Sequence, residues 1–189
     1  MGIGNTATSW GWPARLLHWG MAGLILFQLG LGVTMVWLVS DVARQFTLYQ
    51  THKSWGVVIF TLALIRVAWR AAHRVPDLPM EMSRLEAALA RGSHGALYVL
   101  MVLTPITGWL TASASTLQDR FGIRNMVFGM FELPDPFRPS TGELEVLFRW
   151  AHATCVSALA LLIAIHAAAA LRHQFIRRDG VLRRMILGR

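Results

Sequence analysis

Four long apolar stretches, separated by polar and charged connectors, divide the chain into predicted helices. They run over residues of about 15–39, 52–72, 92–114 and 146–172. A helix needs about 20 largely apolar residues to cross the hydrocarbon core of a bilayer, and each stretch reaches that length. The pattern therefore predicts an all-α fold, a transmembrane four-helix bundle that forms one domain over residues 1–189.

The composition agrees with a lipid environment. Hydrophobic residues make up 54% of the chain and charged residues 15%, and the mean hydropathy is +0.46. Soluble domains usually carry about 25% charged residues. The net charge of +8 could suit nucleic acid, but the basic residues flank the apolar stretches and form no soluble face. We therefore expect membrane lipid as the surrounding partner and no nucleic acid.

The basic residues are distributed unequally between the two ends of the predicted bundle. Arg15, the connector 66–91 and the tail after Leu171 hold 12 of the 18 Lys and Arg residues, and the other two connectors hold 6. Loops rich in Lys and Arg stay in the cytoplasm. Because four spans return the chain to the side on which it started, the sequence predicts a multi-pass membrane protein with both termini cytoplasmic.

Histidines are the residues best suited to carry chemistry in these helices. There are seven, and His152 and His166 lie fourteen residues apart on the fourth stretch. Fourteen residues make about 3.9 helical turns and a rise of about 21 Å, so both imidazoles lie on nearly one face at opposite depths. Ionisable groups inside a bilayer are costly and therefore usually functional. This spacing predicts two metal centres stacked along one helix.

Each of these two histidines has a predicted partner at the same depth in the membrane. His18 begins the first stretch on the inner side, level with His166, and His52 begins the second on the outer side, level with His152. We therefore predict two b-type haems with these four histidines as axial ligands of the iron. Iron held by imidazole on both sides has no open position and transfers electrons. Because Cys155 is the single cysteine, neither haem can be attached through a pair of cysteines.

Small residues would leave room for a porphyrin. The first helix has no side chain at four glycine positions: Gly20, Gly23, Gly30 and Gly32. On the second helix, Gly56 follows His52 by one turn. Gly108 lies fourteen residues after His94, at the opposite depth on the same face, where we expect a haem edge to pass. Ordinary helix packing also favours small residues.

The role of His94 stays open between alternatives. It lies at the inner level, so it could replace His18 as a ligand, bind a haem propionate, or bind a quinone carbonyl. Arg15, Arg66 and Arg70 are candidates for propionates or lipid phosphates at the same side. We interpret His73 and His173, at the edge of the apolar core, as structural residues.

The connector 115–145 is long and combines apolar residues with turn residues. It predicts an ordered lid on the outer surface. Four cations at this side could attract an anionic electron donor: Lys53, Arg120, Arg124 and Arg138.

Several segments resemble a known family, the bacterial cytochromes b561 of the four-helix type. That family is related to the cytochrome b subunits of respiratory formate dehydrogenases and hydrogenases. The matching segments are Arg-Leu-Leu-His-Trp at 15–19, His-Lys-Ser-Trp-Gly at 52–56, Gly-Ser-His-Gly-Ala-Leu-Tyr at 92–98, Pro-Ile-Thr-Gly-Trp at 105–109, His-Ala-Ala-Ala-Ala-Leu-Arg-His at 166–173 and Arg-Asp-Gly-Val-Leu-Arg-Arg-Met at 178–185.

The resemblance implies that the histidines matching His18, His52, His152 and His166 are haem ligands. It also implies electron exchange with a membrane quinone, usually ubiquinone, and one bacterial relative oxidises superoxide at the periplasmic side. We therefore expect a quinone-linked oxidoreductase of the bacterial inner membrane that carries electrons between a periplasmic donor, such as superoxide, and ubiquinone. One alternative is a haem-anchor subunit of a respiratory dehydrogenase or hydrogenase, and another is a non-redox membrane protein with buried histidines.

Overall fold

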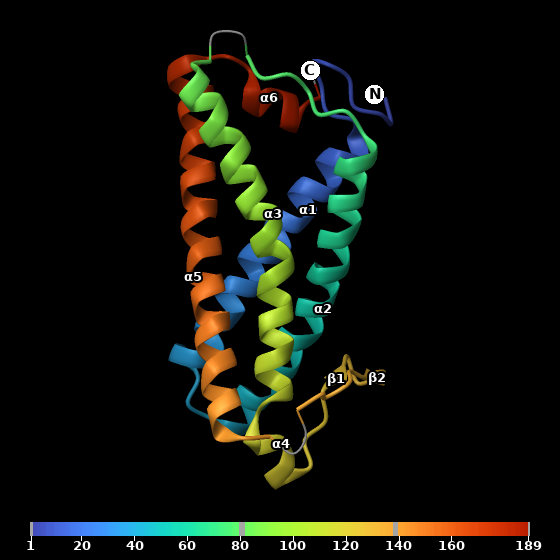
Figure 1. Ribbon diagram of the computed structural model, residues 1–189, viewed down its shortest axis with the longest axis vertical. Coiled ribbons are helices and arrows are strands. Elements are labelled where there is room, and N and C mark those ends of the chain that lie inside the picture. The colour runs from blue at the N-terminus through green and yellow to red at the C-terminus, as the bar shows by residue number, and fades with distance from the viewer. Residues whose placement is uncertain (1, 80–81, 138–139, 189) are drawn as a thin grey trace.

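Four long helices form an antiparallel bundle, as predicted. The computed structural model describes residues 2–79, 82–137 and 140–188. The long helices are α1 (Trp12–Val33), α2 (Val42–Ala72), α3 (Arg84–Ser113) and α5 (Gly142–Arg172). Both ends of the chain lie at the same end of the bundle (Figure 1). The all-α four-helix fold and an even number of spans are therefore confirmed.

The surface of the bundle suits lipid. The four long helices, two of which have π-helical extensions, are each long and apolar enough to cross a membrane. Large apolar side chains face outward, for example Leu16, Val99 and Leu161, which are 64%, 55% and 62% exposed. Apolar side chains at such exposure are stable when the surroundings are hydrocarbon.

Two helices begin well before the predicted positions. α2 begins at Val42 and α3 at Arg84, against predicted starts near 52 and 92. Asp41 caps α2 by accepting a hydrogen bond from the Arg44 amide (2.9 Å), and Ser83 and Glu86 form a capping box at α3. These caps start the helices in polar sequence outside the hydrocarbon core, where hydropathy carries no signal. His52 therefore lies well inside α2, which corrects its predicted place at the start of the helix.

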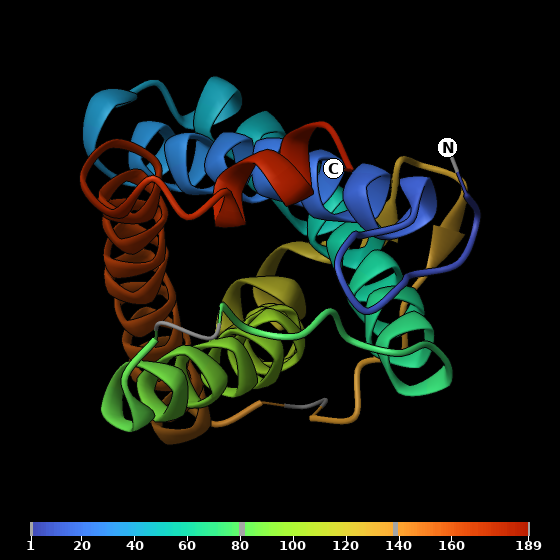
Figure 2. The same ribbon diagram turned by 90° about the horizontal axis from the view of Figure 1, so that it is seen from above.

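The other two long helices differ from the prediction by a few residues at their starts. α1 begins at Trp12 and α5 at Gly142, against about 15 and 146. Both continue into one π-helical turn, η1 (Thr34–Leu38) and η2 (His173–Arg177). A short helix, α6 (Val181–Ile186), then lies across the end of the bundle (Figure 2).

The described part of the connector between α3 and α5 is folded and contacts α2. It contains α4 (Thr116–Phe121) and a two-stranded hairpin, β1 (Met126–Val127) with β2 (Phe131–Glu132), which the sequence did not predict. The Phe128 amide donates to the Ser54 hydroxyl (2.9 Å) and Lys53 donates to the Asn125 side chain (2.8 Å). Both α2 residues follow His52 directly, so the segment is fastened beside that histidine.

A small apolar layer fills the middle of the bundle. Its buried members include one residue from each long helix: Ile25, Ile59, Met101 and Leu159, each at most 8% exposed. Each follows a histidine by seven residues, which is close to two helical turns, so it lies on the same face about 10 Å along the axis. The histidines therefore lie in layers at either side of this core.

Candidate functional site

The histidines of the long helices gather in two groups at opposite ends of the bundle. In the outer group, the ring centroids of His52 and His152 are 6.4 Å apart. In the inner group, the ring of His166 lies 6.2 Å from that of His18 and 5.3 Å from that of His94. The structure therefore brings together both pairs that the sequence predicts, and it adds His94 to the inner pair.

A repeat of seven residues produces this arrangement. Along α5, the order His152, Leu159, His166 places outer group, apolar layer and inner group on one face. The same step leads along α2 from His52 through Ile59 to Arg66. Arg66 therefore belongs to the inner layer, and its guanidinium lies beside His18.

In α1 and α3 the same seven-residue step leads from an inner histidine to a glycine at the outer group. On α1 it runs from His18 through Ile25 to Gly32, and on α3 from His94 through Met101 to Gly108. A methyl group built on Gly108 would lie 3.0 Å from Cε1 of His152, and one on Gly32 would lie 3.6 Å from Cε1 of His52. These glycines therefore make room for the imidazole rings. A haem edge passing at Gly108 stays a prediction.

The outer group has defined hydrogen bonds on one ring. Nδ1 of His152 donates to the Thr104 carbonyl (3.1 Å), and the Thr107 hydroxyl lies 3.2 Å from the same nitrogen. A histidine that donates from Nδ1 keeps its lone pair on Nε2, which is the form that binds metals. Nδ1 of His52 is buried and has no hydrogen-bond partner among the described residues. This nitrogen is therefore available to a group that the protein side chains do not supply.

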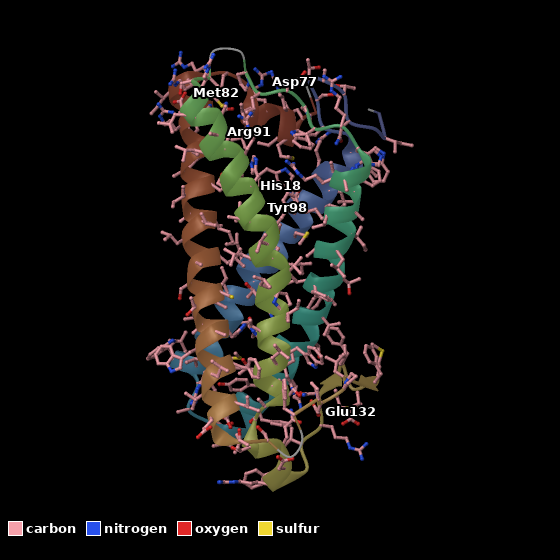
Figure 3. The ribbon with its side chains drawn as sticks, viewed as in Figure 1. His18, Asp77, Met82, Arg91, Tyr98 and Glu132 are labelled. Carbon is pink, nitrogen blue, oxygen red and sulfur yellow. The ribbon has the colours of Figure 1, made fainter. Side chains whose placement is uncertain are left out.

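The inner group includes an arginine and a tyrosine. Arg66 donates to Nδ1 of His18 (2.8 Å) and to the Tyr98 hydroxyl (3.4 Å), and the Arg70 guanidinium lies over the Tyr98 ring, 5.2 Å from its centroid. His18 and Tyr98 lie close together in the half of the bundle that carries the chain termini (Figure 3). The predicted cations Arg66 and Arg70 thus lie beside the inner histidines. Tyr98 was missed, because one tyrosine in an apolar helix carries no distinctive pattern.

The third predicted cation, Arg15, contacts the C-terminal segment. Its guanidinium donates to the Ile186 carbonyl of α6, and Trp19 Nε1 donates to the Met185 carbonyl (3.1 Å). The two bonds fasten α6 to α1 next to His18. A propionate or lipid phosphate at Arg15 stays a prediction.

The remaining histidines have local partners. His73 donates to the Trp69 carbonyl (2.9 Å), and His173 pairs with the Asp179 carboxylate. These bonds agree with the structural interpretation of both residues.

The outer cations are only partly free to attract an anion. Lys53 is bonded to Asn125, and Arg124 lies 3.6 Å from Glu132, whereas Arg120 is exposed. Arg138 lies outside the described residues. The electrostatic case for an anionic donor therefore depends mainly on Arg120.

The histidine pairs fit the needs of haem iron. The porphyrin supplies four ligands, so the protein adds one group on each side of the ring. With metal–imidazole bonds of about 2 Å and a ring radius near 1 Å, imidazoles on opposite sides of one metal have centroids about 6 Å apart. The measured 6.4 and 6.2 Å agree with this requirement. The Nδ1 donor bond of His152 agrees with it too.

A bundle of four membrane-spanning helices with paired imidazoles defines the class of membrane b-type cytochromes. Residues 9–188 match the family described as prokaryotic cytochrome b561. The chain belongs to this family, whose members bind haem b and transfer electrons in bacterial membranes.

Three relatives are similar over most of their length. "Cytochrome b561 homolog 2" of Escherichia coli is 29% identical and aligns with 98% of this chain and 95% of its own. "Cytochrome b562" of Cereibacter sphaeroides is 28% identical over 90% of each chain. "Probable superoxide oxidase CybB" of Yersinia pestis is 26% identical over 71% of this chain and 72% of its own.

Proposed function

We propose that the protein is a di-haem carrier that moves electrons between a periplasmic donor and the ubiquinone pool. His52 and His152 hold the outer haem b, and His18 and His166 hold the inner one. The main support is the distance between the ring centroids of each pair, 6.4 Å for the outer pair and 6.2 Å for the inner pair. The two pairs lie at opposite ends of one bundle. Iron with imidazole on both sides supplies a one-electron couple with no open coordination position.

The choice of His18 over His94 rests on distance. The His94 ring is 5.3 Å from that of His166, closer than the separation of about 6 Å that two ligands on opposite sides of a metal require. The His18 ring at 6.2 Å meets the requirement. His94 is then free for the other role, a hydrogen bond to a quinone carbonyl or to a propionate, since neutral imidazole both donates and accepts.

The surrounding side chains prepare each group for its role. The Thr104 carbonyl orients His152 through Nδ1 and holds its proton there. Arg66 and Arg70 concentrate positive charge at the inner group, which suits propionates there. A His18 that binds iron through Nε2 carries its proton on Nδ1, so it gives up the hydrogen bond that Arg66 donates to that nitrogen. The buried layer of Ile25, Ile59, Met101 and Leu159 excludes water between the two groups.

The donor and acceptor are proposed from the family. The relative named as a probable superoxide oxidase makes superoxide the first donor to test, at the end that carries the hairpin. The histidine, arginine and tyrosine of the opposite end favour the quinone, which needs hydrogen-bond donors for its carbonyls.

A haem count and single alanine variants test the proposal. The pyridine haemochromogen assay should find two haems b per chain in the purified protein. His152→Ala and His166→Ala should each retain one haem, and redox titration should show a different surviving component in each. A wild-type value near one haem per chain would reject the proposal.

The same series separates the inner histidines. His18→Ala should lose the inner component, whereas His94→Ala should keep both haems and lose oxidation by ubiquinone. Loss of a haem in His94→Ala, with both retained in His18→Ala, would make His94 the ligand. A His94 that only bonds a propionate would shift the inner potential and leave quinone turnover intact.

The direction of insertion follows from the charge distribution. The end that carries the termini holds the larger share of Lys and Arg, so we propose that it faces the cytoplasm. A fluorescent protein fused after Arg189 should then fluoresce, and alkaline phosphatase at that position should be inactive. The opposite pair of results would invert the topology.

A further inference from the structure

The segment after α5 forms a hollow at the membrane surface that the redox site does not use. The hollow has a volume of about 360 Å³ and is lined by Gln174, Phe175, Arg178, Gly180 and Arg183. It lies where η2 turns into α6, in the segment that resembles the family at 178–185. Its lining combines two cations with an aromatic ring.

Three of the five described arginines in this tail already have partners. Arg172 and Arg177 pair with Glu86 at 3.3 and 2.9 Å, and Arg184 donates to the Asp77 carbonyl at 3.0 Å. Arg178 and Arg183 differ from these three, because neither has an ion pair or a side-chain hydrogen bond among the described residues. Within the described tail, the two guanidiniums that line the hollow are therefore the two without a protein partner.

The backbone holds this corner in a fixed shape. Arg178 adopts a left-handed conformation with φ of 55°, which is uncommon for a residue other than glycine. The Asp179 carboxylate accepts from the Val181 amide (3.2 Å) and pairs with His173, so it does not neutralise Arg178. The reversal brings Arg178, in the turn after η2, and Arg183 of α6 to one hollow.

Apolar side chains next to these cations extend toward lipid. Phe175 is 68% exposed and Ile176 is 73% exposed, at the end of a helix that can span the membrane. Cations beside exposed apolar groups at the end of a membrane-spanning helix are suited to bind a molecule with an anionic head group and acyl chains.

We propose that this hollow is a binding site for an anionic phospholipid. Arg178 and Arg183 bind the phosphodiester, and Phe175 and Ile176 contact the acyl chains. A zwitterionic lipid binds more weakly, because its own cation opposes the two guanidiniums. The bound lipid bridges η2 and α6 and so supports the segment that Arg15 and Trp19 fasten beside the inner histidines.

Native mass spectrometry of the haem-loaded protein in detergent tests the site. Titration with phosphatidylglycerol should produce an adduct of one lipid per chain at concentrations where phosphatidylcholine produces little. Near a membrane each basic residue contributes roughly a fivefold gain in affinity for anionic lipid. Arg178→Gln and Arg183→Gln should therefore each weaken the adduct about fivefold, and the double variant about 25-fold.

Matched control variants distinguish binding at this site from non-specific attraction of the lipid to the positive charge of the protein. Arg44→Gln with Arg149→Gln removes the same charge from exposed positions at the other end and should leave the adduct unchanged. Arg178→Lys with Arg183→Lys should retain most of it, and the haem spectrum reports folding of every variant. Equal adducts in the wild type and the double glutamine variant would overturn the proposal. Equal binding of the two lipids, or displacement by equimolar inorganic phosphate, would do so too.

Discussion

At the scale of single residues, the outer histidine group depends on a glycine, which has no Cβ. Gly108 lies on α3 opposite His152, and its backbone is so close to the ring that an added Cβ would be 3.0 Å from Cε1 and 3.4 Å from Nδ1. The hydrogen bond from that Nδ1 to the Thr104 carbonyl sets the ring orientation. Glycine is therefore needed here for close approach, since the conformation of a helix interior suits any residue.

Gly108→Ala should displace the His152 ring by a few tenths of an ångström. We expect a changed potential and spectrum for one of the two haems, with the other unaffected, because only the outer ring is touched. Redox titration followed optically measures this.

Gly95→Ala is the control on the same helix. A Cβ there meets nothing within 4 Å, so the variant should gain up to about 1 kcal/mol from helix propensity and leave both potentials unchanged. Equal behaviour of the two variants would show that Gly108 does not constrain the ring.

At the scale of elements, one carboxylate connects the start of α3 to the end of α5. Glu86 accepts from the Ser83 amide (3.2 Å) within the capping box and pairs with Arg172 and Arg177. It thus stabilises the end of a helix and fixes the depth of α3 against α5. Since His94 follows eight residues later on α3 and His166 lies on α5, this connection sets the inner group.

Glu86→Gln should lower the thermal midpoint of unfolding, because the amide cannot pair with two guanidiniums. The decrease should shrink as salt is added, since the two arginines are exposed and salt screens their attraction to Glu86. Scanning calorimetry at low and high salt measures both effects. Glu143→Gln, in the exposed first turn of α5, is the control and should change the midpoint less. A midpoint that does not respond to Glu86→Gln at low salt would contradict the connection.

At the scale of the whole molecule, the bundle is a stack of three layers. The inner layer holds His18, Arg66, His94 and His166, the middle layer holds buried apolar residues from all four helices, and the outer layer holds His52, His152 and two glycines. A seven-residue step in each helix keeps the layers aligned, because seven residues are nearly two turns.

Leu159→Ala tests the middle layer. The side chain is 3% exposed, and its removal leaves a cavity between the helices, so we expect a loss of about 2–5 kcal/mol in the free energy of unfolding. Leu161→Ala, 62% exposed toward lipid, should change it by less than about 0.5 kcal/mol. Reversible unfolding in mixed detergent micelles measures both. Equal losses would show that the layer is not a packed core.

The sequence by itself determined the number of helices and the pairing of the histidines. Both follow from local regularities: hydrocarbon requires about 20 apolar residues per span, and a constant rise per residue converts sequence separation into depth. His152 and His166 could therefore be matched with His52 and His18 before any contact was known.

The tertiary structure alone decided what each histidine touches. The closeness of His94 to His166, the bond from Arg66 to His18, the contact of Gly108 with His152 and the hollow at Arg178 all depend on how helices rotate and approach one another. The early starts of α2 and α3 and the hairpin on α2 lie beyond the apolar stretches, where caps and side-chain contacts determine structure. The period of a helix sets the depth of a side chain, but only packing between helices sets its neighbours.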